Sequence, residues 1–330
     1  GSGGAPLFSI ERGKNEPQEA KKIMNISFSM VCICAIVLMV IGFLFARPIL
    51  VLFGASKDAL IYAYPYLMLY LIGTLPSMIA TGMNPFINAQ GYATTGMFSV
   101  AIGAVANLIL DPVFIFVFGL GIRGAAIATV LSQILSASFV LYFLRKRTEL
   151  KIRVLSPEEI RACGKRAKNI ISLGTAGFIM QLTNSLVTIC CNNVLSVTSG
   201  DLYISVMTIV SSIRQIIDTP IHAVTEGSSP VISYNYGARR PKRVFQAGVT
   251  MGIIAILYTL LAWSVILFVP RFLIGIFSSD PTLIADAVPA LKLYFGAFVF
   301  QALQYVGQTM FKSLGKKKFA IFFSLLRKVI

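Results

Sequence analysis

The sequence predicts an all-α integral membrane protein, and three observations lead to this class. The 330 residues are 56% hydrophobic and 13% charged, with a mean hydropathy of +0.79, whereas soluble domains carry roughly 25% charged residues. The apolar residues form segments long enough to cross a bilayer as helices; in residues 93–119, Asp111 is the only charged residue. A membrane β-barrel would instead contain short segments of alternating polarity.

Each predicted helix is an apolar run that ends in a charged, glycine-containing or proline-containing segment. We expect residues 1–10 to be the end of one helix, and residues 319–330 to be the beginning of another. Between these ends, the predicted spans are 24–46, 59–83, 93–119, 124–144, 167–198, 202–235, 245–269 and 283–311.

The positive charge predicts the orientation of the chain in the membrane. Of the 29 Lys and Arg residues, 21 fall in four loops, at 12–22, 145–168, 239–243 and 312–318. Basic loops of this kind are typical of the cytoplasmic side, so we expect a multi-pass protein of a bacterial cytoplasmic (plasma) membrane. The net charge of +16 then indicates contact with membrane lipid and no nucleic-acid partner.

An internal repeat divides the chain. Residues 3–17 (GGAPLFSIERGKNEP) match residues 227–241 (GSSPVISYNYGARRP) without gaps at a Gly, a Pro, a Ser, a second Gly and a second Pro. The same offset of 224 residues also pairs Tyr70 with Tyr294 and Gly91 with Gly315. Repeats in the same orientation are related by an axis along the membrane normal, with sites near their interface at mid-bilayer.

The repeat predicts a two-lobe bundle and its boundaries. We expect an N-terminal lobe at 1–146 that lacks its first helix, a cytoplasmic connector at 147–166, and a truncated C-terminal lobe at 167–330. The chain would then be an internal fragment, truncated at both ends, of a twelve-helix transporter.

The segments SSPVISYNYGARRPKRV (228–244) and NLILDPVFIFVFGLGIRGAAIATVLSQ (107–133), together with the repeat, resemble the multidrug and toxic compound extrusion (MATE) family of antiporters. Members of this family have twelve helices in two lobes. The resemblance implies export of amphipathic, cationic organic compounds by alternating access, driven by inward movement of protons or sodium ions. It implies a monomer without a bound cofactor, apart from the coupling ion.

Asp111 is the first candidate for binding that ion. Asn107 lies four residues earlier, on the same helical face, and Pro112 frees a backbone carbonyl one turn back. These oxygen ligands suit a proton or a small hard cation. The resemblance implies that Asn107, Asp111 and Thr129 bind the coupling cation together with an acid on the missing first helix. The alternative is that Asp111 only forms hydrogen bonds to a neighbouring helix.

A second candidate lies in SSIRQIIDTPIHAVTEGSSP, where ionisable residues recur every four positions at Arg214, Asp218, His222 and Glu226. Arg214 and Asp218 are expected to neutralise one another. His222 is the only histidine and titrates nearest neutral pH, although a structural role is equally compatible with the sequence. We predict that Glu226 is the acid of the second lobe and contacts a cation, a proton or a cationic substrate.

The predicted substrate cavity contains amides and methionines. Asn84 pairs with Gln308 across the repeat, and Gln181 lies one helical turn from Asn184. Met83 and Met180 could supply an adaptable wall, but simple packing is the ordinary role of methionine in a membrane helix.

Other functions are less compatible with the sequence. The five cysteines have no ligand-rich neighbours, so no disulfide framework or zinc site is expected. The chain contains no nucleotide motif or nucleophile constellation, and we expect no enzyme activity. A lipid-linked oligosaccharide flippase of the same superfamily stays open through Arg214, Lys292, Arg327 and Lys328. A non-transporting membrane subunit is the remaining alternative, which buried acids in both lobes disfavour.

Overall fold

The computed structural model describes residues 1–52, 57–156, 159, 163–198 and 200–326, and within these the regular secondary structure is helical. The chain divides into two compact units, Gly1–Ile171 and Ser172–Ile330. Arg327 and Lys328 lie outside the described residues. Among the described residues, five helices are long and apolar enough to cross a membrane, and the number rises to seven if each of two bent helix pairs is counted as one span. The chain is therefore a multi-pass membrane protein, as predicted.

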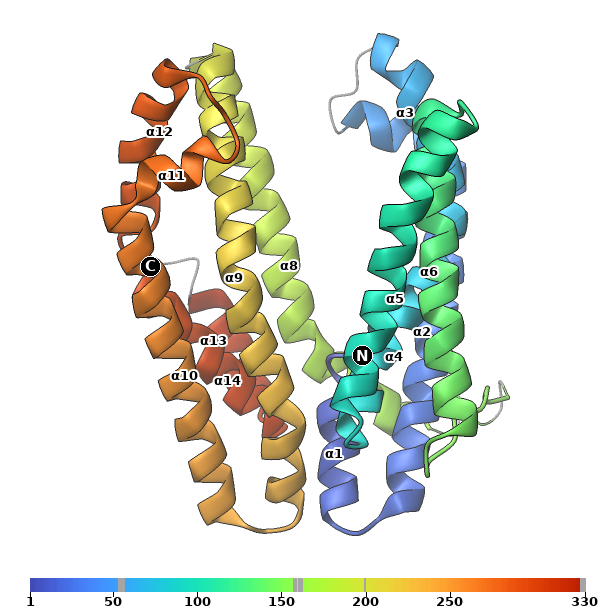
Figure 1. Cartoon of the computed structure of the whole chain (residues 1–330). Helices are drawn as coiled ribbons and strands as arrows, with labels where there is room; N and C mark the ends of the chain where they lie inside the picture. The colour runs from blue at the N-terminus through green and yellow to red at the C-terminus, as the bar shows by residue number, and fades with distance from the viewer. Residues whose placement is uncertain (53–56, 157–158, 160–162, 199, 327–330) are drawn as a thin grey trace. The chain divides into compact units, whose positions relative to one another are not determined.

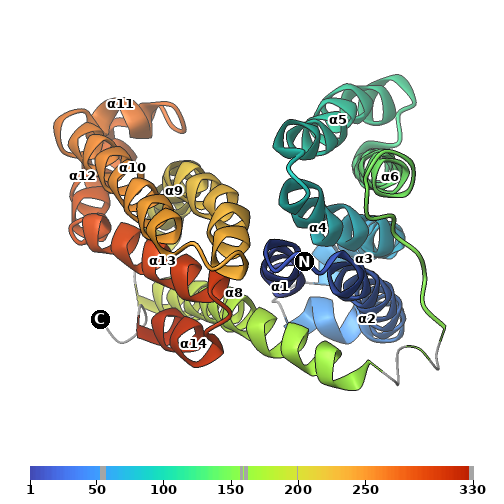
Figure 2. The ribbon, with the colours of Figure 1, turned by 90° about the horizontal axis from the view of Figure 1, so that it is seen from below.

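The first unit is an antiparallel bundle (Figure 1). Its helices are α1 (Gly4–Gly13), α2 (Pro17–Leu52), α3 (Lys57–Ile72), α4 (Thr74–Ala89), α5 (Ala93–Pro112), a π-helix, η1 (Val113–Val117), and α6 (Gly121–Lys146). Helix α1 packs beside α2 and α4 (Figure 2). Phe8, Met24, Met83 and Phe86 are fully buried in the core between these helices.

The second unit repeats this arrangement. Helix α8 (Gly164–Thr198) begins in the first unit and continues in the second. It is followed by α9 (Gly200–Gly237), α10 (Pro241–Phe268), α11 (Pro270–Gly275), α12 (Pro281–Tyr294), α13 (Phe298–Ser313) and α14 (Lys317–Leu326). Helix α9 packs against both α10 and α13.

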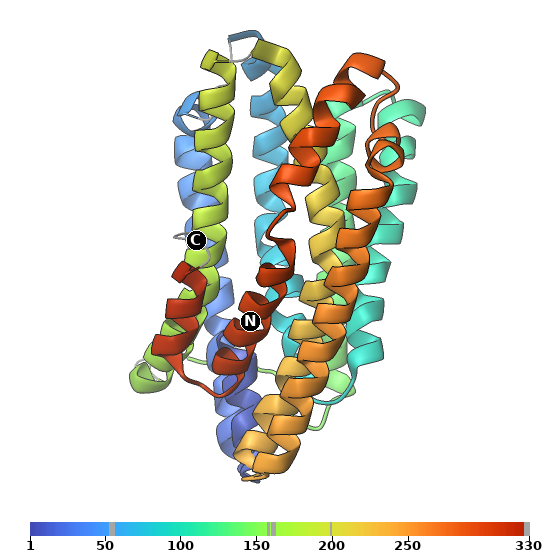
Figure 3. The same cartoon turned by 90° about the vertical axis from the view of Figure 1, so that its left-hand side faces the viewer.

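Two predicted spans are broken, and this corrects the sequence-based assignment. Residues 59–83 were expected to form one helix, but the chain bends by 51° between Leu60–Ile72 and Thr74–Ala89. Residues 283–311 were also expected to be continuous, but α12 and α13 meet at 47° (Figure 3). In the first unit the break falls at Gly73, where a Cβ would lie 2.3 Å from the side-chain oxygen of Gln133. A side chain there would force Gln133 to move.

The two units share unusual backbone features at the predicted offset. In the part of the chain that the structure describes, the non-glycine residues with positive φ are Asn15 (65°) and Arg239 (53°), which are 224 residues apart. Gly91 and Gly315 have φ values of 94° and 67°, and they are separated by the same interval. The two helix breaks also fall at corresponding positions. Each pair of features occurs in a turn or break that reverses or bends the chain, so the repeat extends to backbone conformation.

The connector after α6 is bound to the first unit. Its described residues 148–156 contain no helix, and Ile152 and Leu155 are buried in the core of the first unit. Three buried side chains accept hydrogen bonds from its backbone: Gln90 from Leu150 at 3.3 Å, Asn25 from Arg153 at 3.0 Å and Ser29 from Leu155 at 3.3 Å. This segment is therefore part of the packing of the first unit.

Candidate functional site

Three polar side chains of the first unit lie together between α5 and α6. They are Asn107, Asp111 and Thr129, and we call them the Asp111 group. Asn107 Nδ2 donates to Asp111 Oδ1 at 3.2 Å and to Thr129 Oγ1 at 3.5 Å. Thr129 Oγ1 donates to the carbonyl oxygen of Ala125 at 2.9 Å. The structure therefore brings together the three side chains that the sequence singled out. Their role in ion binding stays a prediction.

The backbone beside these side chains departs from a regular α-helix. Helix α5 ends at Pro112, and the chain continues as a π-helix over Val113–Val117, the wider helix type that occurs frequently at functional sites. A Cβ at Gly124 would lie 2.5 Å from the carbonyl oxygen of Phe114. Only glycine at position 124 allows α6 to approach the π-helix this closely.

Asp111 has polar neighbours but no cationic partner among the described residues. Its side chain is half-buried, and it is absent from all the ion pairs that the described residues form. A carboxylate with one amide donor retains free lone pairs. The group can therefore accept a proton or a small cation.

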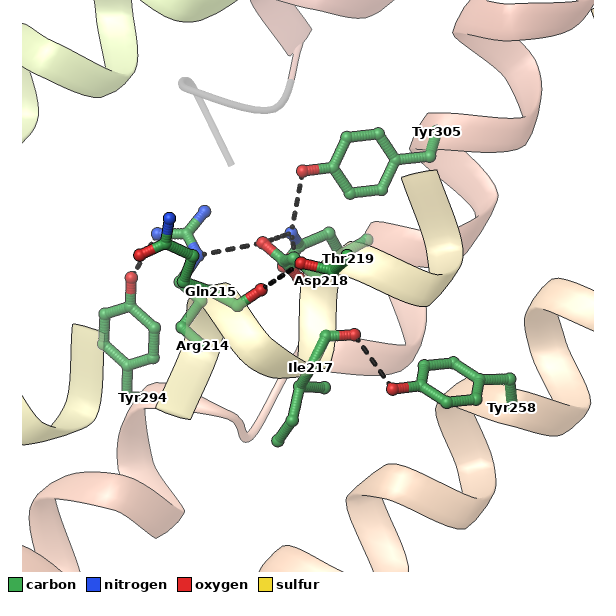
Figure 4. Close-up of polar contacts among 9 residues, drawn as sticks. Arg214, Gln215, Ile217, Asp218, Thr219, Tyr258, Tyr294 and Tyr305 are labelled. Carbon is green, nitrogen blue, oxygen red and sulfur yellow. Dashed lines mark hydrogen bonds and ion pairs between the residues drawn. The ribbon is translucent and has the colours of Figure 1, made fainter. Parts of the chain in front are cut away.

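The second unit contains a more extensive network, centred on Asp218 (Figure 4). Arg214 Nε donates to Asp218 Oδ2 at 3.2 Å, and Gln301 Nε2 lies 3.2 Å and 3.1 Å from the two carboxylate oxygens. Arg214 also donates to the hydroxyl of Tyr294, and its guanidinium lies 5.5 Å from the centre of that ring. Gln301 further donates to Tyr305 Oη at 3.3 Å. The predicted Arg214–Asp218 ion pair is present.

This network connects α9 to both sides of the break between α12 and α13. Tyr294 is the last residue of α12, and Gln301 lies in the first turn of α13. Arg214 and Asp218 lie one turn apart on α9. Arg214 is hydrogen-bonded to Tyr294, and Asp218 is hydrogen-bonded to Gln301. Sequence analysis missed both partners. The match between Tyr294 and Tyr70 in the repeat could have indicated Tyr294. No spacing in the sequence connects Gln301 to Asp218.

His222 and Glu226 continue along α9 but have different partners. The His222 ring packs edge-on against Tyr305, with ring centres 4.4 Å apart. Glu226 Oε1 accepts a hydrogen bond from Lys312 Nζ at 2.8 Å. Lys312 was predicted to lie in the basic loop 312–318, but this was wrong: it lies at the end of α13 and is only 6% exposed. The position of Lys312 gives Glu226 a cationic partner within the protein.

Asn84 and Gln308, the two amides that the repeat pairs, each form hydrogen bonds within their own unit. Asn84 Nδ2 donates to the carbonyl oxygen of Gly96 at 2.7 Å and lies 2.6 Å from Ser99 Oγ. Gln308 is buried and donates to Ser324 Oγ at 2.8 Å. These hydrogen bonds connect neighbouring helices within each unit.

The remaining cavity candidates lie in different surroundings. Met83 is fully buried in the core of the first unit, and Met180 packs on the core of the second; both contacts are ordinary packing. Gln181 is exposed and Asn184 half-buried on α8. Contact with substrate stays a prediction for all four.

The helical bundle, its broken spans and its buried polar groups are those of a membrane transporter. The family model for MatE matches residues 1–113 and 155–330. The chain belongs to the MatE family, so the resemblance predicted from sequence is confirmed.

Curated relatives support the same assignment. The chain is 23% identical over 331 residues to the multidrug export protein MepA of Staphylococcus haemolyticus, and the match covers 100% of this chain and 72% of the relative. It is 21% identical over 336 residues to MepA of Staphylococcus aureus, with the same coverage of both chains.

Solved structures of transporters share the fold. The MATE multidrug transporter DinF-BH, solved in complex with a dye, superposes with a TM-score of 0.90 and 28% identity, covering 100% of this chain and 73% of that one. An outward-facing MATE transporter of the MOP superfamily gives a TM-score of 0.81 and 21% identity, covering 99% and 72%.

Proposed function

We propose that this chain belongs to a cation-coupled antiporter that exports amphipathic, often cationic organic compounds. Membership of the MatE family and the MepA relatives support the export of small organic molecules. The proposed coupling rests on one observation. Among the described residues, Asp111 is an acid that lies within a candidate membrane span, and it has no ion-pair partner. Its polar neighbours contain oxygen atoms.

The mechanism requires that binding of the coupling ion at Asp111 and binding of the substrate to the protein exclude one another. A carboxylate within a membrane span is costly unless it binds a proton or a cation. Binding of the ion from outside would favour the conformation that has released substrate, and loss of the ion to the cytoplasm would favour reloading. Alternating access with this order exchanges one ion for one substrate.

The acids of the second unit are assigned a different role. Asp218 is bonded to Arg214 and Gln301, and Glu226 to Lys312, so each would have to give up an internal partner before binding a cation. We therefore assign the ion to the first unit. The flippase alternative relied on free basic groups in the cavity, and Arg214 is instead neutralised by Asp218.

The test is transport by the complete protein in vesicles, with proton and sodium gradients imposed separately. Export of a fluorescent organic cation should follow one of the two gradients. Asp111→Asn keeps the shape of the side chain but removes its charge, and we expect gradient-driven export to fall at least tenfold while binding of the dye persists. Glu149→Gln is the control, because that carboxylate is 77% exposed and should leave export unchanged. Full gradient-driven export by Asp111→Asn would refute the proposal.

A further inference from the structure

The break between α12 and α13 is a joint that backbone hydrogen bonds do not span directly. The N–H groups of Phe295 and Gly296 donate back into α12 at 3.1 Å and 3.2 Å, and that of Phe298 donates to Phe295 at 3.1 Å. In the described part of the chain, no backbone hydrogen bond joins α13 to α12. The bend of 47° between the two helices therefore depends on side-chain contacts as well as on the three residues between them.

Side chains of α9 form directional contacts with both halves of this broken span (Figure 4). Arg214 donates to the hydroxyl of Tyr294, the last residue of α12. Asp218 accepts from Gln301, in the first turn of α13, at 3.2 Å and 3.1 Å. The ion pair between Arg214 and Asp218, at 3.2 Å, joins these two contacts. Because hydrogen bonds weaken steeply as their angle departs from the preferred range, the four side chains together favour one placement of α12 relative to α13.

Helix α9 is itself held in place at this level. Pro220 removes one backbone donor of the helix, and the hydroxyl of Tyr258 on α10 donates to the carbonyl oxygen of Ile217 at 3.1 Å. The side chains of Arg214 and Asp218 are 25% and 12% exposed, so water competes little with their ion pair. The turns of α9 that contact the broken span are therefore supported from the side of α10.

The other ion pair between α9 and α13 does not reach the joint. Glu226 pairs with Lys312 at 2.8 Å, and Lys312 lies in the last turn of α13. Among the described residues, the hydrogen bonds and ion pairs of these two side chains include none to α12. The chain thus contains two ion pairs between the same two helices, of which one also contacts α12.

We propose that the break between α12 and α13 is a hinge, and that the Arg214–Asp218 pair is the clamp that holds it at this bend. While the pair is closed, Tyr294 and Gln301 attach α12 and α13 to adjacent turns of α9. When the pair opens, the two helices are free to change their angle. This inference does not depend on the proposed coupling at Asp111, because the angle can be measured without an ion gradient.

The test is the distance between one spin label on α12 and one on α13, measured by double electron–electron resonance in the complete protein reconstituted in lipid. The labels are attached at Ala285→Cys and Leu303→Cys, two exposed positions, after all native cysteines have been replaced by serine. Ala285 lies nine residues before the end of α12, which is about 14 Å along the helix axis. A change of about 20° in the bend therefore moves its label by about 5 Å.

The decisive variant is Arg214→Met/Asp218→Leu, which removes both contacts with the broken span and leaves neither charge unpaired. Replacing a buried ion pair by apolar side chains of similar volume is often neutral for stability, so we expect the variant to unfold near the wild-type temperature. The distance between the labels should nevertheless shift, or its distribution broaden, by about 5 Å. A pair that only stabilised the fold would not change this distance.

The matched control is Glu226→Gln/Lys312→Met, which also removes an ion pair between α9 and α13 but leaves the clamp intact. Its label distance should remain that of the wild type. An unchanged distance in Arg214→Met/Asp218→Leu would mean that the packing around the break sets the bend, and it would overturn the proposal, as would an equal change in the control. If Arg214→Met/Asp218→Leu does not fold, Gln301→Leu replaces it, because that change breaks the contact with α13 alone, and the same shift or broadening decides the outcome.

Discussion

The two helical units differ in the partners of the acids on their membrane helices. Asp111 of the first unit accepts a hydrogen bond from the amide of Asn107, whereas Asp218 and Glu226 of the second unit each have a cationic partner. An acid with an internal counter-charge stabilises the fold, and an acid without one is available to a ligand. The comparison shows that the partners on neighbouring helices determine whether a carboxylate is available to a ligand.

The largest expected effect on stability is at Asp218. Asp218→Asn leaves Arg214 mostly buried without its counter-charge, and breaking a buried pair in this way costs about 3 kcal/mol. Asp111→Asn removes a charge that has no partner, so we expect it to change stability by less than about 0.5 kcal/mol. Thermal unfolding of the two purified variants measures the difference. Equal destabilisation by both would mean that Asp111 is also a structural acid.

The sequence predicted the helical class, the family and the members of the Asp111 group, because these depend on local spacing. Asn107 and Asp111 are one turn apart, and the small residues around Thr129 allow α6 to approach. The helix breaks at Gly73 and after Tyr294 were missed, because the mean hydropathy of a segment contains no information about bending. Lys312 was wrongly assigned to the basic loop for a related reason. In the sequence, a basic residue at the end of a helix cannot be distinguished from those of the adjacent basic loop unless its partner on a distant helix is known.

A smaller effect is expected at the pair formed by Glu226 and Lys312, where sequence and structure suggest different roles. Glu226→Gln leaves the buried Lys312 unpaired, and because Glu226 itself is 54% exposed we expect a cost of about 1 kcal/mol. If the pair is structural, Lys312→Met combined with Glu226→Gln should recover both the unfolding temperature and export.

The double variant distinguishes this role from the one predicted from the sequence. If Glu226 binds the coupling ion or a cationic substrate, Glu226→Gln should reduce export more than yield, and adding Lys312→Met should not restore it. Non-additivity of the single changes measures the interaction directly, since the two side chains are in contact. Rescue of stability without rescue of export would return Glu226 to the coupling mechanism.

The smallest expected effect concerns Asp280, an exposed acid of the second unit that also has an internal structural role. Its carboxylate accepts hydrogen bonds from the hydroxyl of Thr282 at 2.8 Å and from the backbone N–H of Thr282 at 2.9 Å, capping α12. These bonds lower the pKa of Asp280.

A lowered pKa in the folded state contributes stability above the unfolded pKa of about 3.9, and this contribution disappears as the pH falls through the folded value. Asp280→Ala should therefore lower the unfolding temperature slightly at pH 6, and the difference from wild type should vanish as the pH falls below the folded pKa. A difference that persists in acid would mean that the aspartate acts through packing and not through its charge, unlike the ion-paired Asp218 and Glu226 of the same unit.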